Sequence, residues 1–171
     1  MKKTNLNSYA AQALVDVYNL NDFEMIYKHL CGQSAAFSSV SAEAFSFEYL
    51  ASRLAMASLS WIAACKENNI TDDAEQKIFL KLIMNSFASP KFVNIASVFS
   101  EYLYSRDEDN KTPSIAVAHL LFKRLGKESM ERTGGVAKMN NGFQVLVEIF
   151  EGFRSSFEND FFEFINAAAT S

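Results

Sequence analysis

The residue types that most often do chemistry in proteins are few in this chain. It has two histidines, His29 and His119, and two cysteines, Cys31 and Cys65. Neither histidine follows a Glu at the three-residue spacing that places a carboxylate and an imidazole on one helix face in di-iron proteins. His29 and Cys31 lie two apart on a predicted helix, so their side chains point in different directions and cannot form a thiol–base pair. The sequence therefore predicts no metal ion, no cofactor and no catalytic motif.

One glycine-containing stretch is a candidate contact for an anion. Arg132, Gly134, Gly135 and Lys138 combine two basic side chains with consecutive backbone N–H groups, and such loops can form an anion-binding concavity. The stretch lacks the preceding strand and the Gly-Lys-Ser/Thr ending of a phosphate-binding loop. We interpret it as a solvated connection, with the anion contact as the alternative.

Composition and charge describe an acidic globular protein. Twenty acidic and sixteen basic residues give the 171-residue chain a net charge of −4, which makes nucleic acid an unlikely partner, although 123–138 carries five basic and two acidic residues. The apolar run Leu54–Cys65 is twelve residues long, whereas a membrane span needs about 20, so no membrane contact is expected. Two cysteines are too few for a disulfide framework, and no apolar segment follows Met1-Lys2-Lys3. We therefore expect a cytoplasmic protein without a signal peptide.

Helical periodicity dominates the chain. In the segment 42–68, apolar residues recur three and four apart, and the other faces carry Ala and Ser instead of charge. Small residues let neighbouring helices approach closely, so this helix is predicted to lie at the centre of the fold. No repeat, linker or change in composition divides residues 1–171. The sequence predicts an all-α, single-domain irregular bundle of six or seven helices around this Ala/Ser-rich helix.

Capping residues and prolines set the expected helix bounds. Ser41 and Asp72 precede helical patterns as N-cap residues, and the pairs at 89–90 and 112–113 place a proline at the first helical position. Gly32 is expected to end the second helix. The expected helices are 8–18, 23–30, 42–68, 73–87, 90–105, 113–125 and 143–167, and 126–142 is expected to be an irregular connection.

The last predicted helix has an unusual apolar pattern. Phenylalanines recur seven residues apart from Phe143 to Phe164, which predicts a stripe buried in the core. Phe162 interrupts the polar face of the same helix, which is then apolar nearly all round from Phe161 to Ile165. Such a patch near a chain end is typical of contact with another chain or a ligand, and the alternative is packing under the N-terminal helix. The candidate interaction residues are Phe157, Phe161, Phe162 and Ile165.

Three functions are compatible with these patterns. The first is a non-enzymatic protein–protein interaction module of the adaptor, inhibitor or immunity type, with a homodimer through the Phe-rich last helix as one form of it. The alternative is a binding protein for an apolar small molecule, in a cavity lined by some of the sixteen Phe and six Met side chains. A third alternative is an enzyme whose site gathers dispersed residues, namely Tyr49, Arg53, His119 and Arg124.

Overall fold

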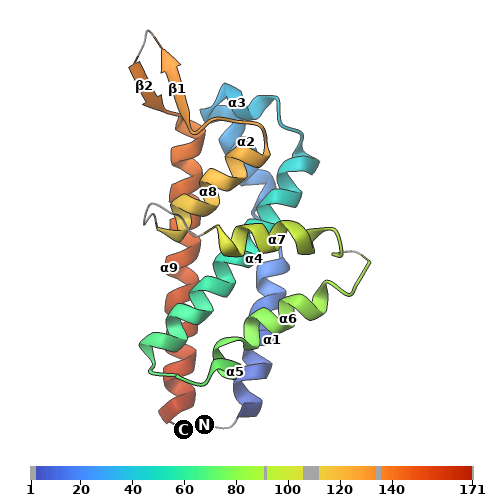
Figure 1. Ribbon diagram of the computed structural model, residues 1–171, viewed down its shortest axis with the longest axis vertical. Helices are drawn as coiled ribbons and strands as arrows, with labels where there is room; N and C mark the ends of the chain where they lie inside the picture. Colours follow the sequence, from blue (N-terminus) through green and yellow to red (C-terminus); the bar gives the residue numbers. More distant parts are fainter. Residues whose placement is uncertain (1–2, 91, 106–111, 134–135, 171) are drawn as a thin grey trace.

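The protein folds as the predicted all-α bundle. The computed structural model describes residues 3–90, 92–105, 112–133 and 136–170, and most of these are helical. Helix α9 (Asn141–Thr170) runs the length of the molecule, and α4 (Ala42–Glu67) packs against it (Figure 1). Within the described ranges, none of the helices combines the length and the apolar character that a membrane crossing needs.

Helix α4 lies at the centre of the fold, as predicted. The Ser41 hydroxyl accepts a hydrogen bond from the Ala44 N–H (3.1 Å) and so caps the first turn. Side chains on most sides of α4 are buried, because the helix packs against α7, α8 and α9. It also contacts α1 over a smaller area. Trp61 is fully buried, and its indole N–H donates to the Glu75 carbonyl (3.2 Å).

Seven helices of nine or more residues make up the described bundle, in agreement with the expected six or seven. Besides α4 and α9 they are α1 (Lys3–Tyr18), α2 (Phe23–Gln33), α6 (Ile78–Ser86), α7 (Ile95–Tyr104) and α8 (Pro113–Arg124). Two single-turn helices, α3 (Ala35–Ser38) and α5 (Asp73–Gln76), connect them.

Several predicted helix boundaries are wrong. Helix α1 begins at Lys3 instead of residue 8, and the expected helix 73–87 is divided at Lys77 into α5 and α6. Gly32 lies inside α2, which ends at Gln33, and the backbone becomes extended at Ser34. The predicted start at Pro90 is also wrong, because α7 begins at Ile95. Before α7 the Phe92 N–H bonds to the Ser89 carbonyl three residues back, which makes turns that do not join the helix.

The segment 126–142 was expected to be irregular, and this prediction is wrong. It contains an antiparallel hairpin of β1 (Met130–Thr133) and β2 (Val136–Met139). Met130 pairs with Met139 and Thr133 with Val136, which leaves two glycines between the strands. The sequence Gly-Gly between two short segments is among the favoured hairpin signals, whereas the apolar alternation of the flanking residues is weak.

Asn140 fixes the hairpin to the helices. Its side chain is buried, and Oδ1 accepts hydrogen bonds from the Gly142 N–H (2.8 Å) and the Ser34 hydroxyl (3.0 Å). A Cβ on Gly142 would approach Ser34 Cβ to 2.8 Å, so only glycine fits this contact between α9 and the end of α2. The orientation of the hairpin relative to α9 is therefore set by the residues that join them.

Candidate functional site

The predicted interaction patch at the end of α9 is largely core. Phe161 is 2% exposed and Ile165 is fully buried. The Phe161 ring packs edge-on against Trp61 (5.3 Å between ring centroids) and against Tyr9 of α1 (6.3 Å). Phe161 and Ile165 are thus buried within the described chain, because α1 and α4 cover this side of α9 and complete the core there.

Two residues of that patch remain accessible. Phe162 is 37% exposed, and its carbonyl accepts a long hydrogen bond from the Asn68 side chain (3.5 Å). Phe157 is half-buried and its ring stacks on Phe161 (5.9 Å). One exposed ring with a half-buried neighbour is a small apolar surface, and the predicted homodimer through α9 stays a prediction.

The predicted anion contact is only partly described. Gly134 and Gly135 lie outside the described residues. Arg132 belongs to β1, where its backbone pairs with Ala137, and Lys138 belongs to β2 and is exposed. This contact therefore stays a prediction.

A second surface combines exposed methionines with basic side chains. His119, Lys123 and Lys127 follow one another four residues apart along one face of α8 and its C-terminal connection, and they line a hollow of about 320 Å³ together with Met130. Met139 stands opposite Met130 across the hairpin. We call these five residues the hairpin surface.

The register of the hairpin places its two methionines side by side. The Asn140 N–H donates to the Ser129 carbonyl (2.9 Å), so the next pair, Met130 with Met139, is one without mutual backbone hydrogen bonds. Side chains of such a pair lie on the same face and closest together. Met130 is 44% exposed and Met139 is 47% exposed, so both members of this pair are accessible.

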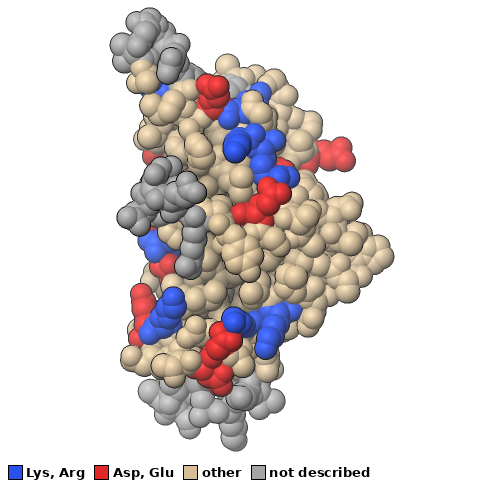
Figure 2. Space-filling model, viewed as in Figure 1, with Lys and Arg blue, Asp and Glu red and all other residues tan. Residues whose placement is uncertain are grey.

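The charge around the hairpin surface is mainly positive. The Lys127 ammonium donates to the Ser39 hydroxyl (2.6 Å), and the Ser129 hydroxyl lies 3.3 Å from His119 Nδ1. Glu128 is the acidic residue among those that line the hollow. Figure 2 shows Lys and Arg side chains grouped over the C-terminal part of α8, in a molecule whose net charge is negative.

A buried carboxylate joins three helices on another side of α8. Glu48 of α4 accepts hydrogen bonds from the Tyr102 hydroxyl of α7 (2.7 Å) and from Arg124 Nε of α8 (2.9 Å). Arg124 also reaches Glu101 through Nη1 (2.7 Å). Burial beside the Glu48 carboxylate raises the pKa of the Tyr102 phenol, which therefore stays a protonated donor. The Glu48 carboxylate, the Tyr102 hydroxyl and the Arg124 guanidinium each have hydrogen-bond partners, and their contacts hold α4, α7 and α8 together.

A second ion pair connects α2 with α4. The Arg53 guanidinium contacts Asp22 (3.0 Å) and lies 4.9 Å from the centroid of the Phe153 ring, a cation–π distance. The Tyr49 hydroxyl donates to the same carboxylate (3.4 Å). Burial, reinforced by Asp22, raises the pKa of the Tyr49 phenol.

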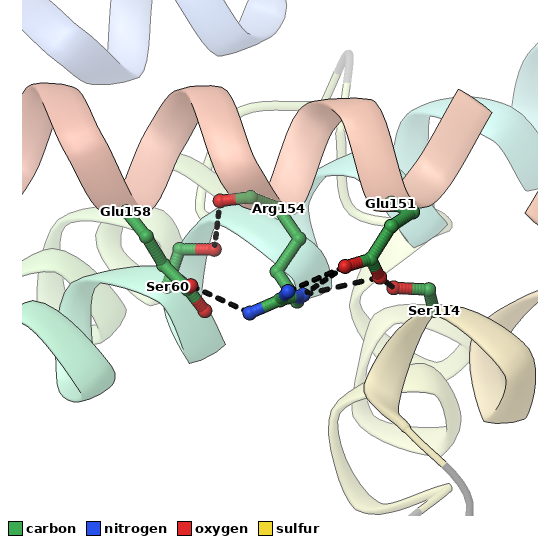
Figure 3. Close-up of polar contacts among 5 residues, drawn as sticks. All are labelled: Ser60, Ser114, Glu151, Arg154 and Glu158. Carbon is green, nitrogen blue, oxygen red and sulfur yellow. Dashed lines mark hydrogen bonds and ion pairs between the residues drawn. The ribbon is translucent and has the colours of Figure 1, made fainter. Parts of the chain in front are cut away.

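A third cluster lies along α9 (Figure 3). Arg154 bridges Glu151 and Glu158 on its own helix, and Glu151 also accepts from the Ser114 hydroxyl of α8. The Ser60 hydroxyl of α4 lies 3.5 Å from the Arg154 carbonyl. Hydrogen bonds from Arg154 and Ser114 lower the pKa of the Glu151 carboxyl, so the contribution of this cluster to stability is present at neutral pH and is lost as the pH falls through that lowered pKa.

The four residues of the enzyme alternative do not share one of these clusters. Tyr49 and Arg53 meet at Asp22, Arg124 pairs with Glu48 and Glu101, and His119 contacts Ser129. The structure therefore brings together only the first two of the four.

Two other hollows lie on the described surface. One of about 340 Å³ adjoins α5 and α6 and is lined by apolar and charged residues alike, including Ile78, Leu82, Glu75 and Lys81. Another of about 410 Å³ adjoins the Glu48–Arg124 pair. Their mixed linings do not favour an apolar small molecule over another ligand.

Comparisons with known proteins found no matching family model, no similar curated protein and no similar solved structure. Within the described part of the chain, no three His, Cys, Asp or Glu side chains lie together so that they could hold a metal ion. The arrangement of the surface itself therefore carries the functional argument.

Proposed function

We propose that this protein is a non-enzymatic interaction module that binds another protein at the hairpin surface. The observation that carries this proposal is the exposure of Met130 and Met139 next to each other on one face of the hairpin. Methionine is flexible and polarizable, which suits an apolar surface that adapts to a partner. Completing the burial of two half-exposed methionines contributes roughly 1 kcal/mol each.

The charge of the hairpin surface favours an acidic partner. Lys123, Lys127 and His119 line the hollow beside Met130, and Lys138 is exposed on the same hairpin. Opposite charges around an apolar contact raise the rate of association and select against basic partners. The preferred partner is a protein segment with both apolar and acidic side chains.

The sequence did not indicate Met130 and Met139 as binding residues, because the hairpin that brings them together was not predicted. One pattern could have revealed them, since the two methionines are placed symmetrically about the Gly-Gly pair. Two residues equidistant from a two-residue turn face each other across it.

Replacing both surface methionines with Glu should remove partner binding. Three tagged proteins are expressed in the organism that encodes the wild type, and the proteins bound to each are quantified. They are the wild type, the double variant Met130→Glu/Met139→Glu and the variant Met25→Glu. We expect at least one partner to be retained by the wild type and lost at least ten-fold in the double variant, because acidic side chains repel an acidic segment and cannot fill apolar contacts.

Met25 supplies the matched control. It is 69% exposed on α2, so Met25→Glu changes the same side chain and the same charge away from the hairpin surface. The control should retain the partner. A partner lost equally from both variants, or from neither, would contradict the proposed function.

A further inference from the structure

We propose that the partner contributes an extended segment that adds a third strand to the outer edge of β2. This inference rests on the proposed function of the hairpin surface and specifies how the partner binds there. The segment is expected to alternate acidic and apolar residues.

The register determines which backbone groups of β2 are open. Ser129 and Asn140 are joined by a backbone hydrogen bond. In an antiparallel hairpin, hydrogen-bonded and non-hydrogen-bonded residue pairs alternate, so Lys138 is the next β2 residue whose backbone bonds to β1. The N–H and C=O groups of Ala137 and Met139 consequently point away from β1. In the described part of the chain, no backbone hydrogen bond joins these groups to another element.

The two strands of the hairpin have few neighbours among the described elements. They contact chiefly each other, and two strands alone are marginally stable in water. A third strand would satisfy the open edge, which is how many domains bind extended peptides. In Figure 1, β2 lies on the side of β1 away from α3, and Met130 of β1 lines the hollow beside α8, so we place the added strand at the outer edge of β2.

The side chains of β2 predict the residue pattern of the segment. Met139 belongs to the apolar face of the hairpin, and Lys138 lies on the opposite face because neighbouring strand residues alternate. A strand beside β2 would place its apolar residues next to Met139 and its acidic residues next to Lys138.

The test uses a capped ten-residue peptide that alternates valine and glutamate, added to the full-length protein. Amide hydrogen exchange of Ala137 and Met139, followed by NMR, should slow at least five-fold at saturating peptide. The same peptide with lysine in place of glutamate should bind at least ten-fold more weakly.

Two proline variants locate the edge. Ala137→Pro removes an outward N–H of β2, and Arg132→Pro removes the equivalent outward N–H of β1, at positions where a strand tolerates proline. We expect binding of the valine–glutamate peptide to fall at least ten-fold in Ala137→Pro and to stay within two-fold in Arg132→Pro.

Several results would overturn strand addition. These are no peptide binding, unchanged exchange of Ala137 and Met139 in the wild-type complex, equal effects of the two prolines, or preferential binding of a single-stranded DNA oligonucleotide. The wild-type exchange readout holds even if a proline variant fails to fold. If the partner captured from cells is still lost in Met130→Glu/Met139→Glu, the proposed function stands and only the strand addition fails.

Discussion

Phe161→Asp is expected to unfold the protein, whereas Phe162→Asp should leave the fold nearly unchanged. The Phe161 ring is in the core against Trp61 and Phe79 (5.4 Å), so the variant loses a buried ring and places an unpaired carboxylate there. Loss of a buried Phe side chain alone costs about 3–5 kcal/mol, and the buried carboxylate adds to it. Most domains have only about 5–15 kcal/mol of stability in total.

Urea unfolding followed by circular dichroism measures this contrast. Phe162 is partly exposed, so Phe162→Asp should change the free energy of unfolding by less than about 1 kcal/mol. Any folded Phe161→Asp protein should also show altered Trp61 emission, because the two rings touch. Equal destabilisation by the two variants would show that the end of α9 is packed differently.

Arg124→Met should cost about 3 kcal/mol of stability. Glu48 is 7% exposed, and without Arg124 its carboxylate would keep the Tyr102 hydroxyl but lose its cation. Removing one partner of a buried ion pair costs about 3–5 kcal/mol, and the lower value applies because Arg124 is partly exposed. The double variant Glu48→Gln/Arg124→Met should recover much of the loss, since it removes the uncompensated charge.

Arg154→Met is the matched control for Arg124→Met. Arg154 pairs with two acids on its own helix at a partly exposed site, so its loss should cost only about 0.2–1 kcal/mol. Both variants are compared with the wild type in the same urea titration at pH 7. If Arg154→Met were the more damaging change, the Glu48–Arg124 pair would not be the main polar connection between α4, α7 and α8.

The helices could be predicted from local sequence because their start signals act locally. Ser41 and Asp72 cap α4 and α5 with their side chains, as their positions before apolar periods indicated. The Ala- and Ser-rich faces of α4 also predicted its central position. By contrast, Gly32 does not end α2, because a glycine with space around it is tolerated inside a helix at a modest cost.

The candidate site could not be predicted to the same degree, because it depends on tertiary contacts. Phe161 and Phe162 are adjacent in a stretch that is apolar on all sides, and only the position of Tyr9 and Trp61 decides which ring is core. Predicting that Met130 and Met139 lie together requires predicting two strands of four residues each. Such strands are too short for periodicity to distinguish from a loop.

Partner binding at the hairpin surface can be measured by comparing methionine oxidation in cells with that in the purified protein. Peroxide converts accessible methionines to sulfoxides, and mass spectrometry measures the rate at each position. Met130 and Met139 are expected to oxidise several-fold more slowly in the cellular complex than in the purified protein. Met25, and Met84 with 49% exposure on α6, should oxidise at the same rate in both. Unchanged oxidation of Met130 and Met139, with protection of Met25 or Met84, would show that the partner binds elsewhere.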